Sequence, residues 1–468
     1  MTMATPVSEA PAIPEESRST PLDARPPRIT SIDAARGFVM LAMIFVNDIA
    51  GVSDKIVPWW MKHYSDMQPP PAVDNGMTFV DLVFPGFLFL VGMSIPFALG
   101  NRLKKGEPWH SILAHVLIRT ASLLLLGIMM VNAEEGPSSW PHLSRDAWTA
   151  MMFGCAILAF CQIAPFWLKK QDVERHRRWR IISLATRSFG LIGLIALAFQ
   201  YAKHSRHHGV AVTSHIITLS PFSLRTSWYG ILGLIGWAYF MGAMVYLFFR
   251  NNRLPLAVCT ALLLGFWVAD HNGSFDNFYL PGFLAPIGVG IAAVISTIGD
   301  HVNLGEDLGS LAAIVTSGIL LATILVTPET ASAGSRIKFT LWFMAATAFA
   351  AMLFYQPFLV WKNDATPPWC LWAAGVTAGL WLLFYIVGDV LRFKWLTKPF
   401  AIAGQNVLLA YLFSEAMESV FNLVKLDDWY DRLAGSTLET AIMRSLGVGV
   451  VLLALTAVLN RLGFRLKL

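Results

Sequence analysis

Long apolar stretches recur along almost the whole chain, and they constrain its fold more than any other feature. Each is about 20 residues long, which is the length an α-helix needs to cross the hydrocarbon core of a bilayer. Only 14% of the 468 residues are charged, whereas soluble domains carry about 25%. The stretches are continuously apolar and do not alternate in polarity, which argues against a β-barrel. The sequence therefore predicts an all-α polytopic transmembrane helical bundle.

The apolar stretches divide into about twelve spanning helices, with ten to thirteen as the range. We predict them at residues 35–52, 77–100, 111–131, 149–168, 181–201, 228–249, 255–270, 309–327, 337–361, 369–388, 399–424 and 437–460.

The distribution of Lys and Arg sets the orientation of the helices. Twelve spans with both termini cytoplasmic place 23 of the 35 Lys and Arg residues inside and 9 outside. If 281–299 also crosses the membrane, 18 Lys and Arg residues lie inside and 14 outside. Because cytoplasmic loops are enriched in Lys and Arg, we interpret 281–299 as a re-entrant or interfacial segment. The basic run from Lys169 to Arg180 is either such a topology signal or a contact for anionic ligands or lipid headgroups.

The first 30 residues form a distinct segment. They contain six prolines and no apolar core of the kind a secretory signal peptide has, so we predict a disordered cytoplasmic tail. The four cysteines lie in or beside apolar segments and show no C-x-x-C spacing. Neither a disulfide nor a zinc site is predicted from them. The net charge of +5 does not by itself predict a nucleic-acid partner.

The first predicted helix has polar residues at both ends. Asp33 and Arg36 lie three residues apart on one face at its cytoplasmic end, where they either cap and anchor the helix or serve a ligand. Asn47 and Asp48 close the helix at its outer end. Polar groups at membrane depth are costly, so they are candidates for function.

The loop after this helix carries the strongest candidate for chemistry. His63 follows two tryptophans and Lys62 at the expected membrane edge. The second helix begins with Thr78, a predicted cap, and with Asp81 three residues later. Asp81 then enters an apolar helix, where a free carboxylate is expensive. We expect it to face the bundle and to accept hydrogen bonds from the loop, including one from His63.

Two other sets of polar residues are candidate sites. Asn406 and Glu415 lie nine residues apart on one predicted helix, on roughly opposite sides, so each is expected to contact a different neighbour. The loop with His204, His207 and His215 matches no structural zinc pattern and lacks a nearby carboxylate. No metal site is predicted.

Taken together, several of these motifs resemble the heparan-α-glucosaminide N-acetyltransferase family, and this chain looks like a bacterial relative. The motifs are Ser31-Ile-Asp-Ala-Ala-Arg-Gly37, Phe45-Val-Asn47, Lys62-His63, Gly76-x-Thr78-x-x-Asp81-Leu-Val-Phe-Pro85, Phe89-x-Val-Gly-x-Ser-Ile95 and Gly404-x-Asn406.

The resemblance implies a single transmembrane acyltransferase domain over 31–468 in the cytoplasmic (inner) membrane. The family takes an acetyl group from acetyl-CoA on the cytosolic side and transfers it to the amine of a terminal glucosamine on the other side. It implies His63 as the catalytic residue, with membrane lipids around the protein and a homodimer as its assembly. Arg36, Asp33 and Asn406 are the candidates for binding acetyl-CoA, and Lys104 and Lys105 are further candidates.

The chemistry of imidazole fits this reading. His63 is either the general base that takes a proton from the attacking group or a transiently acylated carrier. Asp81 or Asn47 would orient the ring, and a buried polar group would stabilise the oxyanion. The acceptor is an amino sugar or a glycan, attacked through an amine or a hydroxyl.

Two other functions remain open from sequence. A transporter or flippase for a sugar or lipid-linked glycan would also explain many helices and polar groups near the midplane. A structural or sensory membrane protein would show neither catalysis nor ligand binding. Consumption of acetyl-CoA would distinguish an acyltransferase from both of these functions.

Overall fold

The computed structural model describes residues 30–67, 73–136, 143–164, 173–207, 210–219, 222–275, 285–327, 330 and 332–468. The predicted tail lies outside these residues up to position 29. The long helices are α1 (Thr30–Ala50), α2 (Val83–Lys104), α3 (Trp109–Glu135), α4 (Arg145–Phe160), α5 (Val173–Gln200), α6 (Gly230–Phe249), α7 (Arg253–His271), α8 (Ala285–Gly299), α9 (Leu311–Val326), α10 (Ala333–Phe358), α11 (Pro367–Phe384), α12 (Lys394–Ala403), α13 (Val407–Val424) and α15 (Leu438–Leu462).

Shorter elements connect or extend these helices. They are the helical turns η1 (Trp59–Met61), η2 (Tyr64–Asp66), η3 (Val80–Leu82), η5 (Leu304–Ser310) and η7 (Tyr385–Val390), the helix α14 (Asp427–Arg432), and the strands β1 (Cys161–Ile163), β2 (Lys203–His207), β3 (Val210–Ser214), β4 (Ile217–Leu219), β5 (Phe222–Leu224) and β6 (Phe464–Leu466). The strands form three antiparallel pairs, β1–β6, β2–β3 and β4–β5, so the all-α prediction holds apart from these small pairs.

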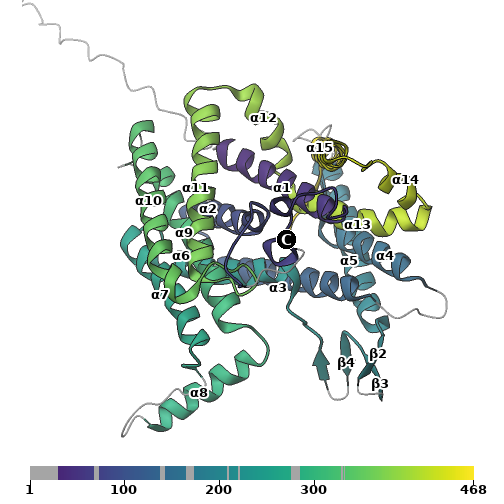
Figure 1. Cartoon of the computed structure of the whole chain (residues 1–468), viewed down its shortest axis with the longest axis horizontal. Coiled ribbons are helices and arrows are strands. Elements are labelled where there is room, and N and C mark those ends of the chain that lie inside the picture. The colour runs from purple at the N-terminus through teal and green to yellow at the C-terminus, as the bar shows by residue number, and fades with distance from the viewer. Residues whose placement is uncertain are drawn as a thin grey trace, which may run out of the picture.

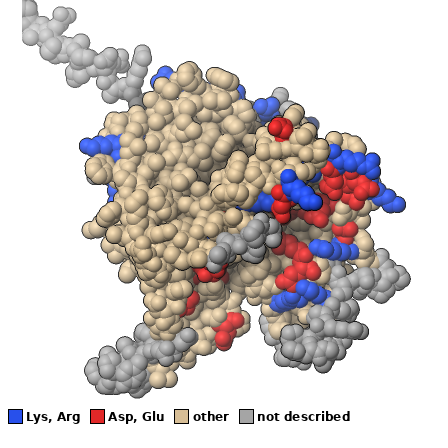
Figure 2. Space-filling view, viewed as in Figure 1, with Lys and Arg blue, Asp and Glu red and all other residues tan. Residues whose placement is uncertain are grey.

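The described helices confirm a multi-pass membrane protein. Ten of them are long and apolar enough to cross a bilayer. Of the other expected spans, α4 has only 16 residues, and α1 carries Asp33, Arg36 and Asp48. Figure 2 shows a broad surface almost free of charge over the region where Figure 1 places α10 and α11. Such a surface suits contact with lipid.

The centre of the bundle is the pair α2 and α9. In the apolar window of the span that includes α9, 83% of residues are buried, against 22% in α10 and α15. The two central helices approach closely through glycines: a side chain at Gly92 would meet the Val315 carbonyl, and one at Gly318 would meet the Phe89 carbonyl. Small residues at such contacts are typical of packed membrane helices, where backbones touch directly.

Two predicted helices end differently from expectation. The helix predicted at 149–168 ends at Phe160, because the next residues form β1 against the C-terminal strand β6. The helix predicted at 399–424 breaks into α12 and α13 at residues 404–406. Gly404 lies against the Asp33 carbonyl, so the chain turns there to pack on α1.

The chain returns to the same end of the bundle after α7. The backbone N–H of Gly305, in η5, donates to the Asp270 carboxylate near the end of α7 at 2.8 Å. The segment between them therefore begins and ends at one place, and its helix α8 projects from the body in Figure 1. Residues 281–284 of the predicted re-entrant or interfacial segment lie outside the described residues.

The glycine contact in the core can be tested with one methyl group. We expect Gly318→Ala to destabilise the protein by about 1–3 kcal/mol, because the new Cβ overpacks the contact with α2. Gly265→Ala is the matched control, since nothing lies within 4 Å of a Cβ there. Thermal unfolding in detergent measures both. Equal midpoints for the two variants would contradict this packing.

Candidate functional site

His63 is held against Asp81 at the loop between α1 and α2. Its Nδ1 lies 2.7 Å from the Asp81 Oδ1. This loop places His63 between the short turns η1 and η2, and Asp81 lies in η3 at the start of the second span. With its proton on Nδ1, the ring donates to the carboxylate and leaves Nε2 as an acceptor. The hydrogen bond expected from the sequence is present.

The loop backbone fixes the Asp81 carboxylate. Its Oδ2 accepts from the backbone N–H groups of Tyr64 at 3.1 Å and Thr78 at 2.9 Å. The Asp81 side chain is 1% exposed. The Thr78 hydroxyl does not cap the helix as predicted, since it donates to the Lys62 carbonyl at 2.7 Å. A buried carboxylate with several donors is stabilised as the anion, so Asp81 can act as a fixed acceptor for His63.

Lys362 joins the pair from the loop between α10 and α11. Its Nζ lies 3.1 Å from His63 Nδ1, 3.4 Å from Nε2 and 4.0 Å from the Asp81 carboxylate. Burial lowers the pKa of the Lys362 ammonium, and the charges of Asp81 and Asp66 act in the opposite direction. No sequence pattern predicts a role for Lys362, because it lies 299 residues from His63.

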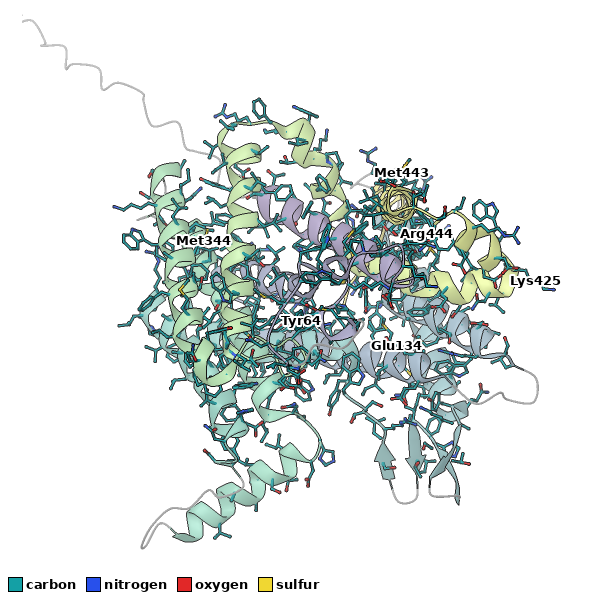
Figure 3. All side chains as sticks on the ribbon, in the orientation of Figure 1. Tyr64, Glu134, Met344, Lys425, Met443 and Arg444 are labelled. Carbon is teal, nitrogen blue, oxygen red and sulfur yellow. The ribbon has the colours of Figure 1, made fainter. Side chains whose placement is uncertain are left out.

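Two of these three side chains, His63 and Lys362, border a cavity of about 350 Å³, here called the His63 cavity. The cavity lies within the size range of small-molecule sites. Figure 3 labels Tyr64, the neighbour of His63, near the middle of the molecule. The walls of the His63 cavity come from six parts of the chain: Met43, Val46, Asn47, His63, Val80, Val83, Phe84, Trp228, Ile231, Leu234, Glu306, Leu311, Lys362, Asn363 and Trp369.

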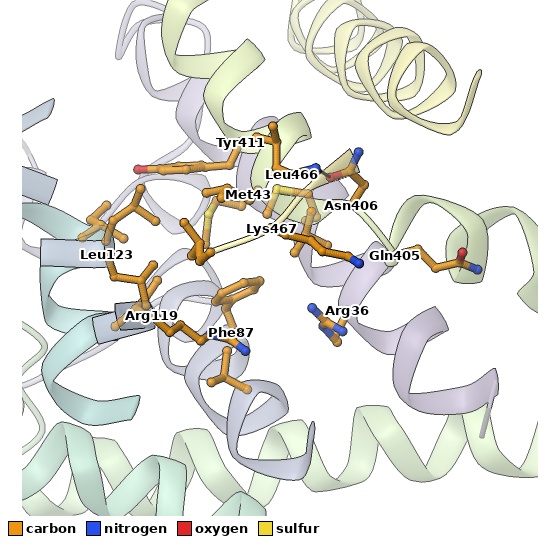
Figure 4. Close-up of a pocket in the computed structure, with 18 of the residues that line it drawn as sticks. Arg36, Met43, Phe87, Arg119, Leu123, Gln405, Asn406, Tyr411, Leu466 and Lys467 are labelled. Atoms are coloured by element: carbon orange, nitrogen blue, oxygen red, sulfur yellow. Dashed lines mark hydrogen bonds between the residues drawn. The ribbon is translucent and has the colours of Figure 1, made fainter. Parts of the chain in front are cut away.

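A second cavity of about 300 Å³, here called the Arg36 cavity, is basic. Its charged lining side chains are those of Arg36, Arg119 and Lys467, with His115 beside them, and none of its lining residues is an Asp or Glu. Figure 4 shows Arg36 and Lys467 directed into the same space. The Arg119 guanidinium lies 4.5 Å from the centre of the Tyr239 ring. Such a lining suits an anionic ligand with several phosphates.

The two cavities meet along one face of α1. Arg36, Met40 and Met43 line the Arg36 cavity, and Met43 and Asn47 line the His63 cavity. These positions follow helical spacing, so they share a face. Arg36 and Asn47 are 11 residues apart, hence about 16 Å along the axis. Met43 and Ile231 line both cavities, so these two apolar side chains lie between them.

The other predicted site residues line the Arg36 cavity, line the His63 cavity or lie outside both. Asn406 lines the Arg36 cavity, where its amide donates to the Phe464 carbonyl at 3.3 Å and its oxygen accepts from Leu466 N–H at 3.1 Å. Asp33 lies 3.6 Å from Arg36 and does not line the cavity.

Lys104 and Lys105 also do not line the Arg36 cavity. Asn47 lines the His63 cavity but donates to Glu415 at 3.0 Å, and the described structure shows no hydrogen bond from it to His63. Glu415 therefore contacts another helix, as predicted.

The altered pKa of Lys362 predicts unusual reactivity. In competitive labelling with trace acetic anhydride, we expect Lys362 to become reactive at lower pH than the exposed Lys105 and Lys425. Burial disfavours its ammonium form, which is the unreactive one. In Asp81→Asn the reactive range should move lower still, since the carboxylate that favours the ammonium is gone. Peptide mass spectrometry gives the profiles, and a Lys362 that titrates with the exposed lysines would refute this assignment.

Comparisons with known proteins agree with the motifs. Residues 28–219 match the family described as Domain of unknown function (DUF5009). Heparan-alpha-glucosaminide N-acetyltransferase of Homo sapiens is 36% identical over 121 residues, which are 25% of this chain. The same-named protein of Mus musculus is 33% identical over 115 residues, or 24% of this chain. Each match spans 16% of the curated relative's length. Over this part of its length, the chain is similar to these two heparan-alpha-glucosaminide N-acetyltransferases.

Proposed function

We propose that this protein is a membrane acetyltransferase that uses acetyl-CoA bound in the Arg36 cavity. The acetyl group would pass to an amino sugar or glycan in the His63 cavity. The observation that carries this proposal is that His63, hydrogen-bonded to Asp81, borders one cavity while a basic cavity adjoins it at Met43 and Ile231. The N-acetyltransferase relatives support the same chemistry.

The sidedness of the reaction rests on the proposed orientation in the cytoplasmic membrane. Twelve crossings with cytoplasmic termini put His63 and Lys362 outside and Arg36 inside. The Asp270–Gly305 contact supports it, because α8 then does not cross. The pairing of β1 with β6 also supports it, because α4 and α15 would end on the same side. The excess of Lys and Arg in the inner loops agrees.

The basic lining supplies a site for the phosphates of CoA. Arg36, Arg119 and Lys467 would bind these phosphates by charge-assisted hydrogen bonds. Asn406 shapes the wall by holding the C-terminal strand. Asp33 would act through Arg36, whose guanidinium it orients, because a carboxylate facing phosphates would repel them. The thioester end would then extend along α1 toward Met43.

The polar groups around His63 supply the steps of acyl transfer. Asp81 holds the imidazole so that Nε2 can take a proton from the attacking group or accept the acetyl group itself. The Lys362 ammonium is placed to stabilise the oxyanion of the tetrahedral intermediate. Asn47 is a second donor on the cavity wall. Two adjoining cavities would also suit a transporter, and consumption of acetyl-CoA distinguishes the two functions.

Replacement of the imidazole tests the central role directly. His63→Ala should lower acetyl transfer by about 10²- to 10⁴-fold, because proton transfer in the transition state is lost. Binding of acetyl-CoA and thermal stability should stay near the wild-type values. His110→Ala is the control, since His110 is exposed and lines neither cavity. A His63→Ala protein with full transfer activity would end this assignment.

Replacement of a cavity arginine tests the donor site. Arg119→Met should raise KM for acetyl-CoA about tenfold or more, because a charge-assisted hydrogen bond is lost. The KM for the acceptor should not change. Lys104→Met removes a positive charge outside the cavity and should leave both constants unchanged. If Lys104→Met raises the KM for acetyl-CoA while Arg119→Met does not, acetyl-CoA binds outside the Arg36 cavity.

A further inference from the structure

Glu306 places a carboxylate in the wall of the His63 cavity. It lies in η5, a turn of π-helix that leads into α9. Asn303 fixes the turn from both sides: its oxygen accepts from the Glu306 backbone N–H at 3.1 Å, and its amide donates to the Glu306 Oε2 at 3.1 Å. The Asp270 carboxylate holds the adjacent Gly305 N–H. The carboxylate is thus placed by the fold, and π-helical turns of this kind are frequent at functional sites.

The Glu306 carboxylate has no cationic partner within ion-pair distance among the described residues. Lys362 lines the same cavity but is committed to His63 at 3.1 Å and Asp81 at 4.0 Å. Most of the remaining wall is apolar, including Val80, Phe84 and Leu311. A carboxylate in such surroundings is costly unless a cation reaches it. A ligand that carries a positive charge would supply that cation.

The loops around the cavity extend this negative charge to the surface. Residues 51–67, 73–79, 300–307 and 359–366 contain seven carboxylates but only three lysines. Of the three, Lys62 is paired with Asp54 and Lys362 with His63. Such a surface attracts cations and repels polyanions.

From these observations we propose that Glu306 binds the ammonium group of the acceptor, and that the acceptor is a cationic amino sugar or glucosamine oligomer. The inference rests on the proposed acetyltransferase function and narrows its acceptor. It excludes sugars that offer only hydroxyl groups, and it excludes aminoglycans that carry many anionic groups.

The chemistry needs a group of this kind beside His63. An amine arrives as R–NH₃⁺ and must lose a proton before its nitrogen can attack, and the Glu306 carboxylate accepts that proton. The nitrogen then bonds to the acetyl carbon, the C–S bond breaks, and His63 passes the second amine proton to the departing thiolate. The products are the amide, CoA-SH and one proton, which leaves Glu306 for solvent.

The test compares acceptors and variants in purified protein with acetyl-CoA. The acceptors are glucosamine, a glucosamine oligomer, N-acetylglucosamine and a heparin-derived oligosaccharide with free amines. Wild-type protein should acetylate the first two at least tenfold more efficiently than the others. Glu306→Gln should raise KM for glucosamine about tenfold or more, since an ion pair is replaced by a neutral contact. The KM of Glu306→Gln for acetyl-CoA should stay unchanged. Glu306→Asp should show a smaller rise in the KM for glucosamine.

The matched control is Glu439→Gln, which removes a negative charge at an exposed position of α15, outside the cavity and outside the acidic loops. It should leave both constants unchanged. Efficient acetylation of the polyanionic oligosaccharide or of hydroxyl groups, or an unchanged glucosamine KM in Glu306→Gln, would overturn the inference and leave acetyl transfer intact. Failure of wild-type protein to consume acetyl-CoA with any acceptor would overturn the proposed function, and this inference with it.

Discussion

The fixed hydrogen bond between His63 and Asp81 is the interaction on which the candidate site depends. A carboxylate at the start of a membrane helix needs donors, and the loop supplies them from the backbone of Tyr64 and Thr78. The same donors that stabilise Asp81 fix its position, and so they fix the imidazole. The loop therefore folds and orders the site together, because the buried Asp81 anion and the orientation of the His63 ring depend on each other.

The helix α1 connects the site with the second cavity toward the opposite end of the bundle. One face of α1 lines both cavities, with Met43 at the point where they meet. Methionine is flexible, so it can fill this gap and also move aside for a thin ligand. The break between α12 and α13 also shapes the Arg36 cavity. It lets Gly404 pack against α1 and places Asn406 in the wall of the Arg36 cavity.

Local spacing explains why part of the site was predictable from the sequence. His63 and Asp81 belong to one loop and the helix after it, and the cost of a carboxylate in an apolar helix pointed to their contact. Arg36 and Asn406 also line the basic cavity, but they were predicted from the cytoplasmic position of Arg36 and from the family-like Gly404-x-Asn406 motif. The multi-pass helical architecture followed from the length of the apolar stretches alone.

Residues that come from distant segments could not be predicted. Lys362, Glu306 and Lys467 reach the cavities only through helix packing, and no spacing rule links them to His63 or Arg36. The end of α4 at Phe160 also depends on distant pairing, since β1 forms against β6 some 300 residues later. Glu306 lies before an apolar helix and resembles an ordinary polar terminus until the cavity around it is seen.

The most direct measurement places donor and acceptor on opposite sides of a membrane. The protein is reconstituted into sealed vesicles that contain glucosamine, and labelled acetyl-CoA is added outside. The account predicts labelled N-acetylglucosamine inside intact vesicles containing wild-type protein. Product that forms only when acetyl-CoA and glucosamine share one compartment would contradict transfer between the two cavities.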